Sequence, residues 1–562
     1  MKKYKIGYIA LTAFLAFSIT GCFNLDEKVY SEITEESFTP SEQDVVALVA
    51  SAYAPLGFVF DWQGLFDNQE EPGDIMITPV RPNGWDDGGT YQRMHKHTWT
   101  DEDWQPWNVY LECYKGINNS NRVKDQIEAG QLPLGDEKDA TIAELRAIRA
   151  LWYSILLDTH GNVPIVKAFS DEIPTQATRT QLYDFVVSEL TEVIESGLLS
   201  TEANTETYAR INQWTAYMIL MRVYLNAEVY TGTAHWKEAL ECANKVIDSG
   251  HYSLSPDYSD NFKVDLGPSN TEVIFAVPYD DIYYATHTFC QHAKWYPPIS
   301  KIHFGWSYQC WGGSCANPQF INSYDPADER LGKTWLTGPQ YAAADESQLV
   351  WTCLNYLPSI TCKNDNGESM TSIDYGYRVN KYEQDLETAW YWSNDFPYFR
   401  YAEALLAKAE CLLRLGQDEG TAVDLVNQIR ARVNAPAVTL DDLQGDTKIK
   451  YGLMSWGSLT YEQYEKVNNG EATWVELGVE GSQTITQSGN DTNPVVLGGL
   501  YDEWGWEFAC EAQRRIQMIR FGTYSTKNWF NHKAVGDDHT QIFPIPLDEL
   551  NSNSNLSQNP GY

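Results

Sequence analysis

Aromatic side chains gather in two irregular segments of the chain, residues 61–108 and 257–395, beside carboxylate, guanidinium and amide groups. Sugar rings have flat apolar faces edged with hydroxyls, so a carbohydrate site needs aromatic faces for the first and polar side chains for the second. Both segments contain both kinds of group. The most prominent rings are Trp62, Trp85, Trp99, Trp104 and Trp107 in the first segment and Trp295, Tyr296, Trp306, Trp311, Trp390 and Trp392 in the second.

Signatures of enzyme chemistry are missing from the sequence. It has no HExxH, GxSxG or GxGxxG pattern, and Gly332-Lys333-Thr334 resembles the end of a phosphate loop except that Ala327 stands where glycine is required. Adjacent carboxylates, such as Asp86 with Asp87 and Glu102 with Asp103, are typical of solvated loops. We therefore expect a binding protein and not an enzyme, with glycoside hydrolysis as the less favoured alternative.

Metal-binding patterns are also missing, so we expect no metal and no cofactor. The ten His residues show no zinc-like spacing, and Asn364-Asp365-Asn366-Gly367 does not match an EF-hand loop. The many acidic side chains leave calcium binding as an open alternative. Among the cysteines of the second segment, Cys310 and Cys315 are the nearest candidates for a disulfide in an oxidising compartment.

The elements that must position these segments are helices. From Phe396, residues at helical spacing form one apolar stripe, while Arg400, Glu403, Lys408 and Glu410 turn away from it. Gly416 ends this helix, and a second stripe runs from Ala422 to Val433. Two such helices pack antiparallel as a tetratricopeptide-like unit, and one unit needs neighbours to bury its face.

Similar helical periodicity predicts further helices in the part of the chain that precedes residue 257. The first begins at Thr39-Pro40-Ser41-Glu42, which combines an N-cap, a proline at the first helical position and a glutamate positioned for a capping box. The predicted helices cover residues 45–53, 110–127, 141–157, 181–194, 214–230 and 236–247. Between residues 257 and 395 the helical pattern fades, and only residues 271–278, TEVIFAVP, predict a short buried strand. The fold class predicted is mainly α, a helical array with an irregular insertion and few short strands.

The charge of the chain limits its partners. Its 562 residues are 43% apolar and carry a formal net charge of −37, which would repel nucleic acid phosphates and anionic lipid headgroups. A neutral ligand, which the negative charge does not repel, fits this chain better than either of these anionic partners.

The N-terminus predicts export and lipid attachment. Lys2, Lys3 and Lys5 precede an apolar run that is short for a membrane span, and Ile19-Thr20-Gly21-Cys22 resembles a bacterial lipobox, in which Cys22 carries the lipid. We divide the chain into a signal peptide (1–21), a lipid-anchored tether (22–38), an N-terminal helical region (39–256) with a ligand loop at 61–108, an insertion (257–395) and a C-terminal helical region with its tail (396–562).

Five features together resemble the SusD-like, or RagB/SusD, family of outer-membrane lipoproteins. They are the lipobox at Cys22; AELRAIRALWYSILLDTHGNVPIV at 143–166; the DFPYFRYAEALLAKAE helix followed by LVNQIRARV; YDEWGWEFACEAQRRIQMIRFG at 501–522; and the closing QIFPIPLDELNSNSNLSQNPGY. The family usually has glycine where this chain has Ala512, which we interpret as variation within a helix that also holds a Glu511–Arg515 pair.

The resemblance implies about four tetratricopeptide units and an irregular part that forms the ligand face. It implies a lipoprotein that captures oligosaccharide at the cell surface, is anchored in the outer membrane, and delivers its cargo to a SusC-like TonB-dependent transporter. Peptide is the alternative cargo, because some relatives serve peptide import. In similar proteins the binding groups come from an early loop and from the insertion, which here points to Asp74, Arg81, Asn83, Trp85, Trp295, Tyr296 and Trp306.

Overall fold

The computed structural model describes residues 40–562 apart from 82–86, 171, 283–290, 361–370, 389–390, 457–462, 464–465, 467–470, 473–476 and 478–484. The predicted signal peptide, tether and lipid site at Cys22 lie outside these residues. Within the described part, no helix combines the length and apolar character that crossing a membrane requires.

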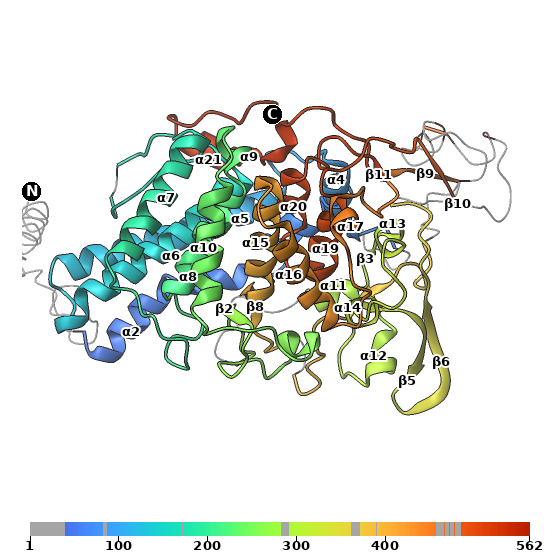
Figure 1. Cartoon of the computed structure of the whole chain (residues 1–562), viewed down its shortest axis with the longest axis horizontal. Coiled ribbons are helices and arrows are strands. Elements are labelled where there is room, and N and C mark those ends of the chain that lie inside the picture. Colours follow the sequence, from blue (N-terminus) through green and yellow to red (C-terminus); the bar gives the residue numbers. More distant parts are fainter. Residues whose placement is uncertain are drawn as a thin grey trace, which may run out of the picture.

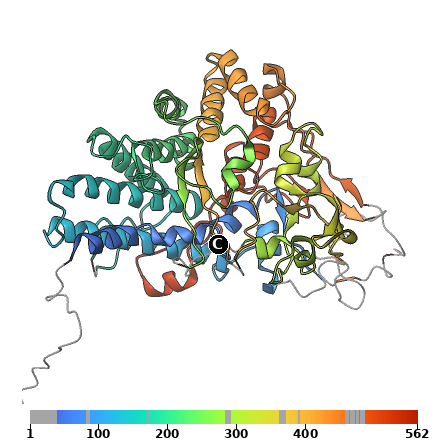
Figure 2. The same cartoon turned by 90° about the horizontal axis from the view of Figure 1, so that it is seen from below.

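A row of helices forms the body, and each helix packs on the one that follows it in the row (Figure 1). They are, in this order, α5 (Trp104–Glu128), α6 (Lys138–Thr159), α7 (Arg179–Glu195), α8 (Gln213–Leu225), α10 (Trp236–Asp248), α15 (Tyr401–Leu415), α16 (Glu419–Ala431) and α17 (Leu440–Gln444). Seen from below, the row of helices curves into an arc from the left to the top of the picture, and the insertion lies on the right (Figure 2). The predicted class, mainly α and tetratricopeptide-like, is confirmed.

Local sequence explains where these helices begin, end and pack. Helix α10, predicted over residues 236–247, buries Ala239, Cys242, Ala243 and Val246 on one face. Helix α7 begins with a capping box at Thr178, and α15 ends at Gly416, whose φ of 61° favours glycine.

The insertion separates α10 from α15 in sequence, yet these two helices pack directly against each other. Its predicted buried strand is confirmed as β2 (Val273–Val277), which pairs antiparallel with β8 (Phe396–Arg400). The other sheets are equally small. They pair β1 (Met76–Ile77) with β3 (Cys315–Ala316), β4 (Trp335–Leu336) with β7 (Arg378–Val379), β5 (Gly338–Ala342) with β6 (Asp345–Cys353), and β9 (Gly452–Trp456) with β10 (Ile485–Ser488) and β11 (Trp529–Phe530).

Short helices complete the described part. Before the array lie α2 (Glu42–Ser51), α3 (Leu65–Glu70) and α4 (Thr90–Lys96), and within it α9 (Ala227–Thr231). The insertion adds α11 (His292–Trp295), α12 (Ser300–Phe304), α13 (Pro318–Ile321) and α14 (Arg330–Thr334), and the C-terminal part adds α19 (Gly498–Phe508), α20 (Arg514–Arg520) and α21 (Leu547–Ser552).

The helix predicted from Phe396 begins five residues later. Residues 396–400 are strand β8, and α15 starts only at Tyr401. Aromatic residues favour strands and proline is tolerated in edge strands, so the sequence FPYFR suits an edge strand. Strand β2 is its hydrogen-bonding partner.

Of the four charged residues expected to turn away from the core, three are buried, which corrects the expectation for Arg400, Glu403 and Glu410. Arg400 and Glu410 are fully buried and Glu403 is 2% exposed. Each has an opposite charge from another element: Glu403 pairs with Arg222 and Glu410 with Arg520. Burial is tolerated because the charges are paired and hydrogen-bonded.

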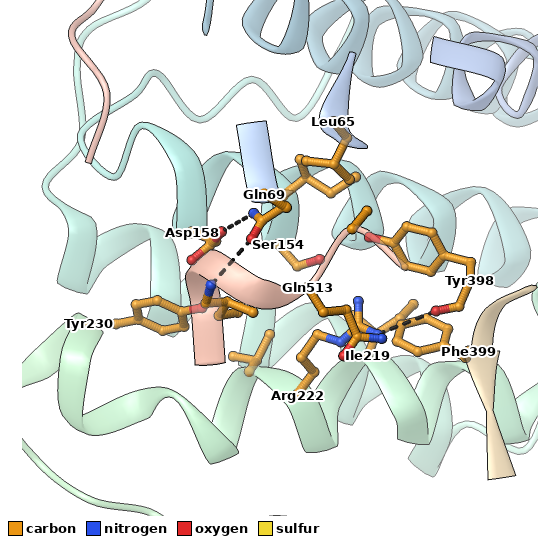
Figure 3. Close-up of a pocket in the computed structure, with 14 residues that line it drawn as sticks. Leu65, Gln69, Ser154, Asp158, Ile219, Arg222, Tyr230, Tyr398, Phe399 and Gln513 are labelled. Carbon is orange, nitrogen blue, oxygen red and sulfur yellow. Dashed lines mark hydrogen bonds between the residues drawn. The ribbon is translucent and has the colours of Figure 1, made fainter. Parts of the chain in front are cut away.

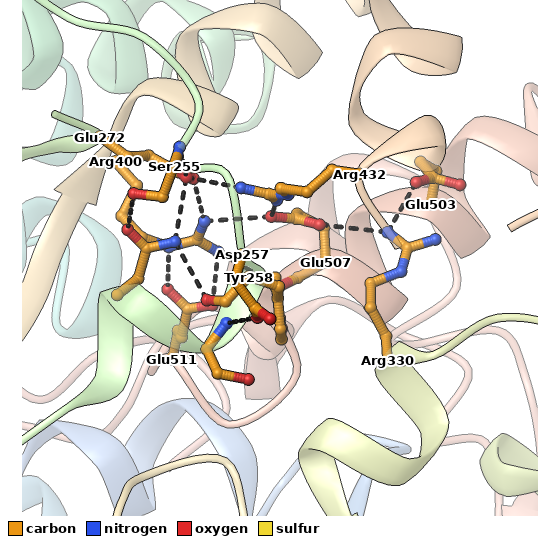
Figure 4. A network of polar contacts seen from close by, with 12 residues as sticks. Ser255, Asp257, Tyr258, Glu272, Arg330, Arg400, Arg432, Glu503, Glu507 and Glu511 are labelled. Atoms are coloured by element: carbon orange, nitrogen blue, oxygen red, sulfur yellow. Dashed lines mark hydrogen bonds and ion pairs between the residues drawn. The ribbon is translucent and has the colours of Figure 1, made fainter. Parts of the chain in front are cut away.

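Arg400 belongs to a buried network that ties the insertion to the C-terminal helices (Figure 4). It contacts Glu272, Glu507 and Glu511. Glu507 also pairs with Arg330 and Arg432. Burial alone raises the pKa of Glu507, but the guanidiniums of Arg432 and Arg400 outweigh it and lower the pKa to about 2.

The continuous helix expected around Ala512 is broken. Helix α19 ends at Phe508 and α20 begins at Arg514, and between them Cys510 and Ala512 take positive φ angles of 62° and 58°. The expected Glu511–Arg515 pair does not form, because Glu511 pairs with Arg400 whereas Arg515 pairs with Asp158. Position 512, where the family resemblance led us to expect glycine, therefore has a left-handed backbone, which glycine adopts without strain.

Candidate functional site

The two irregular segments lie against each other. Strand β1 pairs antiparallel with β3, with Met76 opposite Ala316 and Ile77 opposite Cys315. Beside this ladder, the Asn317 amide donates to the carbonyl of Asp74 at 2.7 Å. Cys310 and Cys315, the pair considered for a disulfide, are both buried free thiols.

A buried ion pair joins the same segments below the surface. The ammonium of Lys294, on α11, contacts the carboxylates of Asp67 on α3 and Glu71 at its end, the second at 2.8 Å. Burial alone lowers the pKa of Lys294, but the two carboxylates more than offset it and raise the pKa above its ordinary value. The cation therefore stays charged and fixes α11 to α3.

Two indoles meet where these segments reach the surface. Trp62, just before α3, and Trp311, after α12, lie with ring centroids 4.3 Å apart and ring planes at 72°. Trp311 is 37% exposed and Trp62 is half-buried. Edge-to-face packing of this kind is favourable. Trp62 thus braces Trp311, and Trp311 presents a ring to solvent.

Tight turns hold both indoles in place. A Cβ atom on Gly64 would lie 1.7 Å from the carbonyl oxygen of Phe58, so only glycine fits beside Trp62. Gly312 has φ of 72°, and a Cβ there would lie 2.5 Å from Pro297 Cα. The backbone N–H of Trp311 donates to Ala293 at 2.8 Å, which fixes the turn on α11.

Polar groups surround the indole pair. The Asp61 side chain accepts the backbone N–H of Trp62 at 2.7 Å, and its carbonyl accepts the amide of Gln291 at 3.0 Å. The Gln63 amide approaches the carboxylate of Asp87 at 3.5 Å. Asp87 is exposed and Asp61 is half-buried. Ring face and hydrogen-bonding groups together suit a hydroxyl-rich, uncharged ligand.

Two of the polar residues predicted to bind ligand, Asp74 and Arg81, are buried and hydrogen-bonded to other groups of the protein. Asp74 is fully buried and accepts hydrogen bonds from Arg514, Tyr451 and Tyr501. Arg81 is 2% exposed and donates to the carbonyls of Gly313, Ser372 and Tyr375. Burial and the nearby Arg378 lower the pKa of Arg81 to about 9. Both side chains hold loops together.

The three rings predicted from the insertion are buried as well, which corrects the expectation that they face outward. Trp295 and Tyr296 are fully buried, and Trp306 is 7% exposed. Trp295 stacks on Tyr382, with centroids 5.8 Å apart, and Trp306 stacks on Phe304 at 4.3 Å. These rings form a core for the insertion, which has little regular structure to supply one.

Asn83 and Trp85, the remaining predicted residues, lie outside the described part, and their ligand contacts stay a prediction. The sequence contains no signal that separates the surface pair from the buried rings. Trp62 and Trp311 are each followed within two residues by glycine, but so is Trp504, which is 1% exposed.

A cavity behind α3 is too small to hold an oligosaccharide (Figure 3). Its volume is about 40 Å³, room for about three water molecules. Gln69 spans it, donating to Asp158 at 2.7 Å and accepting from the backbone of Ile516 at 3.2 Å. Within the described residues, no group of three or more His, Cys, Asp or Glu side chains is arranged to hold a metal ion.

Comparisons with known proteins identify relatives along nearly the whole chain. Residues 271–562 match the family described as "SusD family", and residues 25–225 match one described as "Starch-binding associating with outer membrane". The starch-binding protein SusD of Bacteroides thetaiotaomicron is 25% identical over 610 aligned positions, covering 98% of each chain.

Solved structures share the fold. Surface glycan-binding protein A from Bacteroides uniformis has a TM-score of 0.66 at 18% identity, covering 92% of this chain and 99% of that one. Surface glycan-binding protein A from Bacteroides thetaiotaomicron, in complex with laminarihexaose, also has a TM-score of 0.66 at 18% identity, covering 92% and 100%.

Proposed function

The chain belongs to the SusD family, and from this premise we propose that it is a non-enzymatic protein that binds neutral oligosaccharide. The observation that carries the proposal is the Trp62–Trp311 pair at the junction of the two irregular segments. An exposed indole braced from behind offers a rigid flat face to a sugar ring.

Names of relatives support carbohydrate over peptide as the ligand. One relative is described as starch-binding, and one structural neighbour was solved with laminarihexaose. The site residues favour the same choice, because a ring face edged with carboxylate and amide groups satisfies hydroxyls better than it satisfies varied peptide side chains. The acidic surroundings and the net charge of −37 favour uncharged glycans over uronates or sulfated chains.

We further propose that the protein is anchored through Cys22 to the outer membrane, faces outward, and passes its glycan to a SusC-like TonB-dependent transporter. This part rests on the lipobox and on family membership. Several acyl chains on one cysteine would hold the protein far more firmly than a single chain does.

A glycan array tests the proposal directly. The lipid-free protein, residues 23–562, should bind one or more neutral oligosaccharides, release no shorter products from them on incubation, and ignore anionic ones. A parallel peptide array should show no binding. Binding to peptides alone, or sugar products that accumulate in proportion to protein, would overturn the assignment.

A further inference from the structure

A second exposed indole lies at the start of α5. Of the tryptophans whose burial the structure describes, only Trp104 and Trp311 are exposed, and Trp104 is the more exposed, at 56%. Trp107, one helical turn later on the same side, is half-buried. Neither residue is among those predicted to bind ligand. Contact between an apolar indole and water is unfavourable in free energy, and a ligand that covers the ring removes that contact.

Successive contacts along the surface connect Trp104 to the Trp62–Trp311 pair. Gln63, next to Trp62, approaches the carboxylate of Asp87 at 3.5 Å. The guanidinium of Arg93 then donates to the carbonyl of Gly88 at 2.8 Å. We call this surface, from Trp62 through residues 87–88 and Arg93 to Trp104, the ledge.

A buried carboxylate fixes the far end of the ledge. Asp103, which is 5% exposed, accepts from Arg93 Nε at 3.1 Å and from Thr90 at 3.1 Å. It also accepts the backbone N–H of Thr100 at 2.8 Å. Trp104 follows directly, so its backbone is held in place while its indole remains in solvent. A preorganised ring loses little freedom when a ligand covers it.

We infer that Trp104 is a distal sugar-stacking subsite, occupied only by glycan chains long enough to extend along the ledge from Trp311. The inference rests on the proposed function and deepens it, because it makes the protein selective for chain length. Two stacking positions on one chain act together: the second sugar binds at the high effective concentration that the first creates. Long chains should therefore bind more tightly than short ones.

The residues near Trp104 favour a sugar over a membrane or a protein partner. Glu102 is exposed and Asn108 half-buried, which provides acceptors and donors for hydroxyls beside the ring. Anionic membrane surfaces attract basic segments, whereas this helix start contains Asp101, Glu102 and Asp103. A protein hot spot would have apolar neighbours that exclude water.

The test compares Trp104→Ala with wild type on an array of neutral oligosaccharide ladders, from disaccharide to dodecasaccharide, of β-1,3-, β-1,4- and α-1,4-glucan, xylan and mannan. We expect W104A to weaken the longest bound chains at least about tenfold and the shortest bound chains less than about twofold. Phe169→Ala is the matched control, because Phe169 is 59% exposed and its backbone N–H contacts Asp125, near the other end of α5. The two ends of this 25-residue helix are roughly 36 Å apart.

Each other result overturns the inference. Equal loss at every length would make Trp104 part of the proximal site or of the fold, and unchanged affinity at every length would leave it no role in glycan binding. Unchanged affinity together with lost co-purification of the transporter, or lost binding to vesicles, would assign Trp104 to a protein or membrane contact. If wild type binds no glycan, the proposed function fails and the inference with it; if wild type binds and W104A binds equally well, the inference alone fails.

Discussion

The carboxylate of Asp74 accepts two hydrogen bonds from the guanidinium of Arg514, 2.6 Å from Nε to Oδ1 and 3.1 Å from Nη2 to Oδ2, although 440 positions separate the two residues in sequence. Both are fully buried. The pair ties the first irregular segment to α20, so Asp74, which was predicted to bind ligand, fastens this segment to the helical body.

Asp74→Asn should therefore destabilise the whole protein. Removing one partner of a buried ion pair leaves the other charge uncompensated and typically costs about 3–5 kcal/mol. Chemical denaturation, followed by circular dichroism, measures the loss. The exposed Asp184 on α7 provides the control, and Asp184→Asn should change the free energy of unfolding by less than about 0.5 kcal/mol. Equal effects of the two variants would contradict a structural role for Asp74.

Ala512→Gly should stabilise the protein. Ala512 has φ of 58°, a left-handed conformation that costs a non-glycine residue roughly 1–2 kcal/mol. Glycine removes that strain but adds freedom to the unfolded chain, so we expect a net gain of about 1 kcal/mol. Ala509→Gly is the control, because Ala509 has φ of −51° and glycine there should be destabilising. A less stable A512G would refute the strain argument.

Glu507 should make the protein sensitive to acid. Its pKa is lowered from 4.5 to about 2 in the fold, so its stabilising effect is complete above about pH 4.5 and is lost as the pH falls toward 2. Glu507→Gln should cost about 3–5 kcal/mol at neutral pH, because several guanidiniums lose a shared partner, and should flatten the loss of stability between pH 4.5 and 2. Melting curves across pH measure both effects.

The control for that experiment is Glu241→Gln, at an exposed position on α10. Its acid profile should match wild type. An E507Q profile that falls as steeply as wild type would show that other carboxylates control acid unfolding.

Lys294→Met should weaken glycan binding although Lys294 is buried and cannot reach a ligand. The change leaves Asp67 and Glu71 without their shared cation and frees α11, which positions Trp311 through Ala293. We expect a lower melting temperature and a several-fold weaker affinity, measured on folded protein well below that temperature. Full affinity in a destabilised K294M would show that Trp311 is held without the ion pair.

Helical periodicity allowed most of the body to be predicted, because each helix must bury one stripe on its neighbours. The helix predicted over residues 236–247, for example, is α10, which buries Ala239, Ala243 and Val246 on one face. Periodicity failed where burial depends on distant partners. Arg400 looks like a surface residue in the helix that the spacing predicted, and only Glu272, Glu507 and Glu511, from other segments, make its burial favourable.

The same limit applies to the candidate site. Trp295 and Trp311 both lie in the aromatic-rich sequence of the insertion, and composition cannot tell which ring fills its interior. Tertiary packing decides it: Trp295 stacks on Tyr382, whereas the turn at Gly312 leaves Trp311 at the surface. The sequence did allow the two cooperating segments to be predicted, though not their exposed residues.

Isothermal titration of the double variant Trp62→Ala, Trp311→Ala tests the central claim most directly. The titrant is the neutral oligosaccharide that wild type binds best on the array, and F169A is the control. We predict at least a tenfold loss of affinity, about 1.4 kcal/mol, in a variant with the helical circular dichroism of wild type, and no change in F169A. Wild-type affinity in the folded double variant would contradict the account.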